Sequence, residues 1–309
     1  MRRERGALAY LFAYFTGEEN KGEQIYFSLS EDGLNWKDVN DRKPVLIPNA
    51  GTKGARDPFI VKNEKSNKYY LIATDLNIAD NTSWHTAQYE GSKGIFVWES
   101  DDLINWNEFR LVNIGVLGAG CVWAPEAIYL PDSDRFFVFY ASMTSINEEA
   151  PKQRIYGTYT KDFKEFSEPF IYVQKDNHVI DMTMIKVNDK FYRFTKDETT
   201  KRVIMDCVTN VEDISLSKTE DIHCQVLEET DGVEGPEIYK LPDGRFCLIM
   251  DQFASHKGYK PFICTDLDKA DFIAAKEHEY SFDLAKKRHG GIIEISDEEY
   301  NRMMDFYAK

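Results

Sequence analysis

Several features are scarce or missing in this sequence of 309 residues, and each absence narrows the class of protein. No apolar run approaches the roughly 20 residues that a transmembrane helix needs, so we expect no membrane partner. Basic residues are few: 38 Lys and Arg stand against 53 Asp and Glu, which gives a formal net charge of -15. Because this charge repels phosphate groups, we expect no nucleic acid partner and a neutral or cationic small ligand.

Cysteine is also scarce. The five cysteines form an odd number without metal-ligand spacing, and they lie at positions 121, 207, 224, 247 and 264. Cys207, Cys247 and Cys264 fall inside expected strands, where a free thiol behaves as a small buried hydrophobe. This pattern favours a reducing compartment, and we expect a cytoplasmic protein rather than a secreted one.

The N-terminus imitates a secretory signal, since basic residues within positions 1–5 precede an apolar stretch at residues 7–15. No small-residue cleavage site follows, and the apolar stretch is rich in aromatic residues that favour strands. We therefore expect residues 7–15 to form a structural strand.

The sequence does contain a recurring motif, in which a carboxylate precedes a short apolar run. Its copies lie at residues 55–61, 123–128, 180–185 and 233–238, and a fifth copy at 288–293 has histidine in place of the carboxylate. The key residues are Asp57, Glu126, Asp181, Glu234 and His289, which are separated by 69, 55, 53 and 55 positions. Such recurrence is typical of repeated structural units that cover their apolar faces with neighbouring units.

Each repeat has room for four antiparallel strands of about five residues with their turns, which is the size of a propeller blade. The sequence therefore predicts an all-β fold, with one five-bladed β-propeller domain over residues 1–309. The first strand of each blade lies nearest the axis, so the five key residues should form one ring at the mouth of the central channel. A capping-box pattern at residues 296–299 predicts a short C-terminal helix.

The two ends of the chain complement each other. Residues 7–15, 23–29 and 44–48 are predicted to be strands of a blade that lacks its inner strand. The His289 repeat supplies an inner strand with no further strand after it. We expect the two ends to pair and close the ring, because closure removes the sheet edges that invite aggregation.

Carboxylates held by the rigid strands of different blades suit acid and base roles in one cavity. Inverting glycoside hydrolysis needs a base that activates water and an acid that protonates the leaving oxygen, about 6.5 to 9.5 Å apart. Asp57 and Glu234 would face each other across a five-bladed channel at that scale. Asp181 would lie between them and raise the pKa of Glu234 by like-charge repulsion, which keeps the acid protonated near neutral pH.

Other residues have two interpretations each. Trp123 fits both a core position and a platform for a sugar face. Arg193 fits both a bridge between strands and a substrate contact. The loop at residues 76–93, which carries Trp84, fits both a binding-site wall and a plain surface excursion. For Glu126 we favour a structural role or a contact to a sugar hydroxyl over a catalytic role.

Five motifs in register resemble glycoside hydrolase family 43 over nearly the whole chain. They are Arg56-Asp57-Pro58, Trp123-Ala124-Pro125-Glu126, Ile180-Asp181, Val233-Glu234-Gly235-Pro236 and Arg288-His289-Gly290. The resemblance implies a five-bladed propeller of inverting enzymes that act on α-L-arabinofuranosides and β-D-xylosides, with some galactan-active members. It further implies that Asp57 is the general base, Asp181 the aspartate that tunes the pKa of the acid, and Glu234 the general acid.

The resemblance also bears on cofactors and on substrate binding. His289 matches a histidine that contacts a central calcium ion mainly through water, so it implies a possible structural calcium and no cofactor for the chemistry. Arg288 matches an arginine on the substrate side. Many relatives have aspartate where this chain has Glu126, which leaves the role of Glu126 open.

The sequence thus predicts an inverting, exo-acting glycoside hydrolase of the arabinofuranosidase or β-xylosidase type. Its substrates would be oligosaccharides from plant polysaccharides such as hemicellulose. Two alternatives fit the same residues: a carbohydrate-binding propeller without catalysis, and a related propeller enzyme that acts on other glycosides. A binding protein would leave the oligosaccharide intact, and a fructoside-cleaving relative would retain the anomeric configuration.

Overall fold

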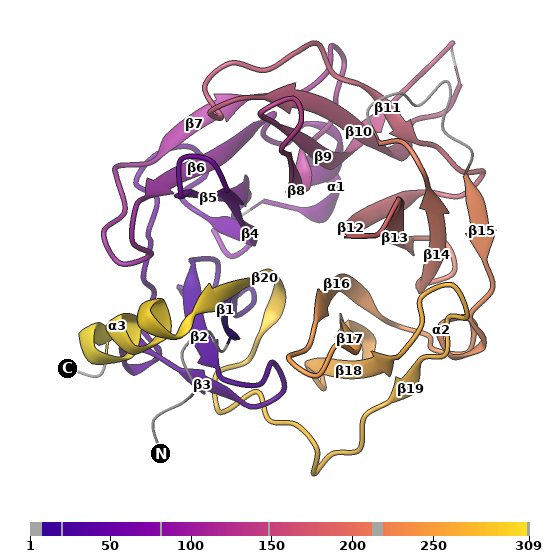
Figure 1. The fold of residues 1–309 in the computed structure, drawn as a ribbon. Coiled ribbons are helices and arrows are strands. Elements are labelled where there is room, and N and C mark those ends of the chain that lie inside the picture. The colour runs from indigo at the N-terminus through magenta and orange to yellow at the C-terminus, as the bar shows by residue number, and fades with distance from the viewer. Residues whose placement is uncertain (1–7, 20, 81, 148, 212–218, 308–309) are drawn as a thin grey trace.

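A computed structural model describes residues 8–19, 21–80, 82–147, 149–211 and 219–307. Within these residues, five sheets of four antiparallel strands stand around one axis like the blades of a propeller (Figure 1). The predicted all-β, five-bladed propeller is confirmed. Among the described helices, none is long and apolar enough to cross a membrane.

Four blades follow one another along the chain, each from an inner strand at the axis to an outer strand at the rim. Blade one contains β4 (Ala55–Asn63), β5 (Lys68–Asp75), β6 (Gly94–Ser100) and β7 (Arg110–Asn113). Blade two contains β8 (Trp123–Leu130), β9 (Arg135–Thr144), β10 (Lys152–Thr160) and β11 (Phe170–Val173). Blade three contains β12 (Val179–Val187), β13 (Lys190–Asp197), β14 (Arg202–Val208) and β15 (Glu220–Ile222). Blade four contains β16 (Glu234–Lys240), β17 (Phe246–Asp251), β18 (Tyr259–Cys264) and β19 (Ile273–Ala274).

The fifth blade joins the two ends of the chain. From the axis outward it contains β20 (Arg288–Ser296), β1 (Leu8–Phe15), β2 (Tyr26–Ser30) and β3 (Trp36–Asp38). Strand β1 pairs antiparallel with β20 along its full length. The strand predicted at residues 7–15 and the predicted closure are confirmed. The strand predicted at residues 44–48 is wrong, because this segment makes only an isolated bridge through Leu46 and β3 takes the third place.

Three short helices complete the described chain: α1 (Trp84–Tyr89), α2 (Gln225–Glu228) and α3 (Asp297–Tyr307). Helix α3 is the predicted C-terminal helix. The Ser296 backbone N–H donates to the Glu299 carboxylate at 2.9 Å, and the Glu299 N–H donates to Ser296 Oγ at 3.2 Å, so the capping box forms. Tyr300, Met303 and Tyr307 bury the inner face of the helix against blades five and one.

Apolar side chains fill the wedges between neighbouring blades. Between blades four and five, the rings of Tyr10 and Tyr239 lie 5.9 Å apart. The Tyr10 hydroxyl donates to Lys240 O at 2.8 Å, and the Tyr239 hydroxyl donates to Gly33 O at 2.7 Å. Such rings bury large apolar areas while their hydroxyls stay paired, so the wedges hold the inner strands at defined angles around the axis.

The inner strands of blades one to four share a bulge at their entrance. The bulged residues have positive φ angles: Asp57 (49°), Ala124 (47°), Asp181 (49°) and Gly235 (51°). In blade five the strand register skips His289. The prediction that Glu126 and Glu234 occupy equivalent places in one ring is wrong. The bulge is the feature that recurs in blades one to four, and Glu126 lies two residues after its bulge whereas Glu234 lies one residue before its own.

Candidate active site

A pocket opens at the end of the axis where the inner strands begin. Its lining residues come from every blade and from α1: Phe15, Arg56, Asp57, Leu76, Trp84, Trp123, Ile180, Asp181, Glu234 and His289. The structure therefore brings Asp57, Asp181, Glu234, Trp123 and His289 together, as the sequence predicted. The predicted residue Arg288 adjoins the pocket through an ion pair with Glu234.

Asp57 is oriented by two blades. Thr74 Oγ1 donates to Asp57 Oδ2 at 2.9 Å and accepts from the Ala124 backbone N–H at 2.8 Å. On the other side, His289 Nδ1 lies 3.5 Å from Asp57 Oδ1 and 3.8 Å from Asp181 Oδ1. The imidazole ring therefore stands between the two aspartates, and Asp57 Oδ2 is held by a fixed donor.

Asp181 is buried beside the bulge of the next blade. The Gly235 backbone N–H donates to Asp181 Oδ2 at 3.2 Å. Burial raises the pKa of Asp181 to about 6. His289 and Lys196 oppose this shift, whereas the neighbouring Glu234 and Asp57 add to it. Asp181 is therefore the carboxyl of this pocket that holds a proton in weakly acidic solution.

Glu234 has a cation on each carboxylate oxygen. Lys196 Nζ donates to Oε2 at 2.8 Å, and Arg288 Nη2 donates to Oε1 at 2.7 Å. Burial opposes ionisation, but the two cations outweigh it and lower the pKa of Glu234 to about 2. The repulsion from Asp181 is present, but the prediction that it keeps Glu234 protonated near neutral pH is wrong, because the charges of Lys196 and Arg288 outweigh it.

Arg288 belongs to a larger ion network. Its Nε donates to Asp251 Oδ2 at 2.5 Å, and its Nη1 lies 3.6 Å from Glu18 Oε2. Glu18 also pairs with Arg56 at 2.9 Å, and Arg56 pairs in turn with the buried Glu23. The segment after β1 thus contributes charged groups that hold Arg56 and Arg288 beside the pocket, which the sequence motifs did not reveal.

Arg193 does not line this pocket, and its predicted substrate contact is corrected. It lies on β13, where its Nε donates to Asp206 Oδ1 of β14 at 2.6 Å. Its guanidinium also lies 5.1 Å from the ring centroid of Tyr172 in blade two. Arg193 is buried in these contacts, so it joins strands and neighbouring blades, as the alternative interpretation proposed.

The surroundings of His289 do not form a protein cage for a metal ion. Calcium takes six to eight oxygen ligands in proteins. In the described ranges, no group of three or more His, Cys, Asp or Glu side chains is placed to hold one ion. His289 Nδ1 instead faces the carboxylates of Asp57 and Asp181. The contact of His289 with a calcium ion stays a prediction.

The polar groups that orient the carboxylates share one position on the second strand of a blade. Each pairs in register with the residue just before the bulge: Thr74 with Arg56, Lys196 with Ile180 and Asp251 with Glu234. Thr74 binds Asp57, Lys196 binds Glu234 and Asp251 binds Arg288. The pairing of each inner strand with the second strand would have identified these residues, because each lies opposite the residue just before the bulge.

Glu126 lies deeper in the channel than predicted. A second ring of residues lies further along the inner strands, two positions after each bulge in blades one to four and two positions after His289 in blade five. It consists of Phe59, Glu126, Thr183, Glu237 and Gly291. Glu237 accepts from Thr183 Oγ1 at 3.0 Å and from the Ile292 N–H at 2.7 Å. Burial raises the pKa of Glu237 to about 8, and burial together with the nearby Glu237 raises the pKa of Glu126. Glu126 is therefore a buried carboxyl whose charged form is disfavoured, and not a group at the mouth.

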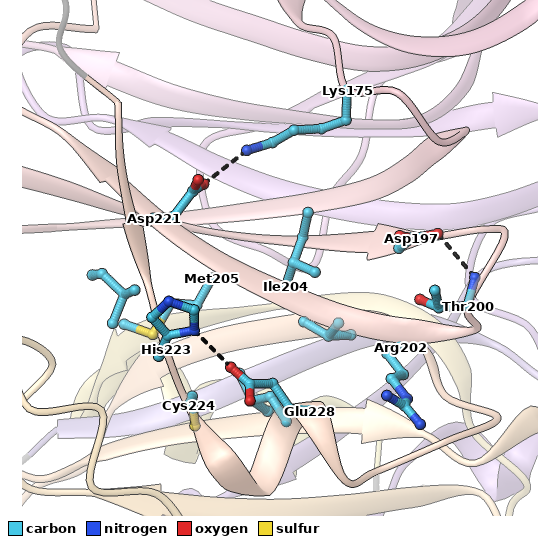
Figure 2. A pocket seen from close by; sticks show the side chains of 13 residues that line it. Lys175, Asp197, Thr200, Arg202, Ile204, Met205, Asp221, His223, Cys224 and Glu228 are labelled. Carbon is cyan, nitrogen blue, oxygen red and sulfur yellow. Dashed lines mark hydrogen bonds and ion pairs between the residues drawn. The ribbon is translucent and has the colours of Figure 1, made fainter.

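Another pocket lies away from the axis, where β14, β15 and α2 line it together with neighbouring residues of blade three (Figure 2). It has a cavity volume of about 410 Å³. Its polar pairs are Lys175 with Asp221 at 2.9 Å and His223 with Glu228 at 3.1 Å. None of the three carboxylates on the axis reaches it, so we place the active site at the axial pocket although the outer pocket is roomier.

The fold and the axial pocket define a class: a five-bladed propeller that presents three carboxylates from separate blades at one end of its axis, as propeller glycoside hydrolases do. A family model for glycosyl hydrolases related to family 43, described as a probable glycosyl hydrolase domain, matches residues 6–301. The chain belongs to this family.

Known proteins similar to this chain are named for different substrates. An α-L-arabinofuranosidase of Bifidobacterium longum subsp. longum is 29% identical over 300 residues, covering 83% of this chain. The chain spans only 28% of that protein's length. A thermostable family-43 glycoside hydrolase superposes with a TM-score of 0.51 at 17% identity, covering 76% of this chain and 74% of its own. The exo-β-1,3-galactanase of Phanerochaete chrysosporium, solved with β-1,3-galactotriose, has a TM-score of 0.51 at 15% identity and coverages of 75% and 53%.

Proposed function

We propose that this glycoside hydrolase family member is an inverting, exo-acting enzyme that releases α-L-arabinofuranose or β-D-xylose from plant-derived oligosaccharides. One observation carries the proposal: Asp57, Asp181 and Glu234 come from three blades and line one pocket. The arabinofuranosidase relative supports arabinofuranose as the first sugar to test. The galactanase shares only the fold, so β-galactosides belong in the same assay panel.

In this mechanism Asp57 is the general base. Thr74 holds Asp57 Oδ2, which leaves Oδ1 to accept a proton from the attacking water. The water adds to the anomeric carbon while the glycosidic bond breaks on the opposite face, so the configuration inverts. The proton of the water ends on Asp57, and the leaving oxygen needs a second proton from the acid.

The acid role falls to Glu234, which must first gain a proton. In the unliganded pocket Lys196 and Arg288 keep it ionised, while Asp181 carries the raised pKa. A sugar whose hydroxyl groups accept hydrogen bonds from Arg288 would weaken the hold of this cation on Glu234. The pKa of Glu234 would then rise toward that of Asp181. Glu234 would take up a proton and donate it to the leaving oxygen.

Aryl glycosides test this function. The panel contains the nitrophenyl α-L-arabinofuranoside, β-D-xyloside and β-D-galactoside. Asp57→Asn and Glu234→Gln should each lower kcat by about 10²- to 10⁴-fold, while Glu64→Gln at the opposite end of the channel serves as the control. The anomer formed first, followed by NMR, should be the inverted one. Full activity in either active-site variant, or a retained anomer, contradicts the proposal.

A binding protein without catalysis is the second candidate, and a specific observation favours it. Both oxygens of Glu234 are paired with cations, and its pKa lies at about 2, which is far from the value of an acid that works near neutral pH. If no glycoside of the panel is cleaved but an oligosaccharide raises the melting temperature, this second function holds.

A further inference from the structure

Trp84 stands at the rim of the axial pocket with half of its surface in solvent. It is the first residue of α1 and lines the same pocket as Asp57, Asp181 and Glu234. Its exposed fraction is 51%, which is high for an aromatic side chain of this size. An exposed aromatic ring beside a polar pocket is a feature of ligand sites.

Two contacts set the orientation of this ring. The rings of Trp84 and Trp123 meet nearly at a right angle, with centroids 6.2 Å apart and planes inclined by 83°. The Arg56 guanidinium lies 5.1 Å from the Trp84 ring centroid, and Glu18 and Glu23 hold this guanidinium in place. Because Arg56 covers one face of Trp84, a ligand can stack only on the opposite face.

Helix α1 is anchored, so the ring is positioned before any ligand binds. Ser83 Oγ accepts from the Thr86 N–H at 3.0 Å, and Ala87 is buried. Gly91 N donates to Gly120 O at 2.9 Å, which ties the end of α1 to the segment that leads into β8. A methyl group on Gly120 would lie 2.4 Å from Gln88 O, so the two segments are in close contact. A rigid platform loses little conformational entropy when a ligand docks.

We propose that Trp84 and Trp123 form a corner that binds the sugar on the leaving-group side of the scissile bond, with the open face of Trp84 stacked on the apolar C–H face of that sugar. This inference rests on the proposed function and narrows the substrate class. A terminal sugar at the three carboxylates leaves the next sugar at the rim, where Trp84 lies. The substrate is therefore an oligosaccharide with at least one more ring, and Trp84 determines specificity for it.

The test compares a trisaccharide with a glycosyl fluoride of the same terminal sugar, because a fluoride leaving group cannot reach Trp84. The trisaccharides are α-1,5-arabinotriose, β-1,4-xylotriose and β-1,3-galactotriose. Trp84→Ala should lower kcat/KM about tenfold for the cleaved trisaccharide and less than about threefold for the fluoride. Trp84→Phe should restore most of the trisaccharide activity. Equal losses on the two substrates overturn the proposal.

Tyr89 supplies the matched control, since it is an exposed aromatic on the same helix and lies outside the pocket lining. Tyr89→Ala should leave the ratio between trisaccharide and fluoride unchanged. If the wild-type protein cleaves no probe, the proposed function fails and calorimetric binding of the trisaccharides decides the inference. Weaker binding by Trp84→Ala than by Tyr89→Ala then supports it, and equal binding or no binding overturns it.

Discussion

Lys196 Nζ lies 2.8 Å from Glu234 Oε2, and this ion pair governs the charge of the proposed general acid. Arg288 pairs with the other oxygen at 2.7 Å. Together the two cations lower the pKa of Glu234 to about 2, whereas burial raises the pKa of Asp181 to about 6. Between these two values the unliganded pocket keeps its proton on Asp181 and leaves Glu234 ionised.

Replacing Lys196 should therefore move the pH dependence of the reaction. An acid catalyst works only while it is protonated, so activity falls as the pH rises through its pKa. Lys196→Gln removes one of the charges that lower the pKa of Glu234, and the pKa should rise by about one to two units. The basic limb of the kcat/KM profile should shift to higher pH by the same amount, as measured on the aryl glycoside that the wild type cleaves.

Lys190 gives a control for this shift. It lies on the same strand and pairs with Asp268 at 2.6 Å, away from the pocket. Lys190→Gln should leave the basic limb in place. An unchanged limb in a folded Lys196→Gln protein would show that Glu234 is not the acid whose pKa Lys196 sets.

Thr74 should act as a positioning residue for Asp57. Its hydroxyl links Asp57 Oδ2 to the Ala124 backbone N–H, and Thr74→Val removes both hydrogen bonds. We expect kcat to fall about tenfold with KM nearly unchanged, because Asp57 loses its orientation. The unpaired N–H should also cost about 1 to 3 kcal/mol of unfolding free energy. Thr74→Ser keeps the hydroxyl and should restore kcat, and failure of this rescue would assign Thr74 a packing role only.

The fold could be predicted because its signals are local. Each inner strand carries a polar residue in its first half, ahead of an apolar run, and the complementary ends of the chain predicted the pairing of β1 with β20. Asp57 and Asp181 were predicted correctly as members of one ring because each is both the charged residue of its motif and the bulged residue of its strand. In these two blades the charge and the backbone irregularity coincide.

The rest of the site depends on contacts between segments that lie far apart in the sequence. In blades two and four the bulge falls on Ala124 and Gly235, so the carboxylates of Glu126 and Glu234 sit beyond and before it. Lys196 looks like an ordinary residue at the end of a strand until its pairing with blade four is known. The pKa of Glu234 follows from that pairing, and no motif in the sequence contains it.

The buried pair in the channel should make stability depend on pH. Burial raises the pKa of Glu237 to about 8 from an ordinary value of 4.5. The unfolded chain therefore releases this proton more readily, and the folded state loses stability as the pH rises from about 4.5 to about 8. Glu237→Gln cannot ionise, so its melting temperature relative to the wild type should rise by a few degrees between about pH 5 and about pH 8.

Glu64 is a suitable control for this measurement, because it is an exposed glutamate at the far mouth of the channel. Glu64→Gln should follow the wild-type melting temperature at both pH values. The contrary result is a melting temperature of Glu237→Gln that differs from that of the wild type by the same amount at both pH values. Glu237 then does not change its charge over this range, and the second ring does not contribute to the pH dependence of stability.

A side chain at Gly235 should destabilise the protein, for two separable reasons. Its φ angle of +51° strains any other common residue, and an added methyl group would lie 2.8 Å from His289 Cγ. Gly118 has a φ angle of +78° with nothing within 4 Å, so Gly118→Ala measures the backbone strain alone, about 1 to 2 kcal/mol. Gly235→Ala should destabilise the protein by more than this and should also lower kcat, because the overlap displaces His289 from Asp57 and Asp181. Equal melting temperatures for the two alanine variants, together with unchanged kcat in Gly235→Ala, would mean that the backbone around Gly235 shifts to accommodate the methyl group without moving the carboxylates.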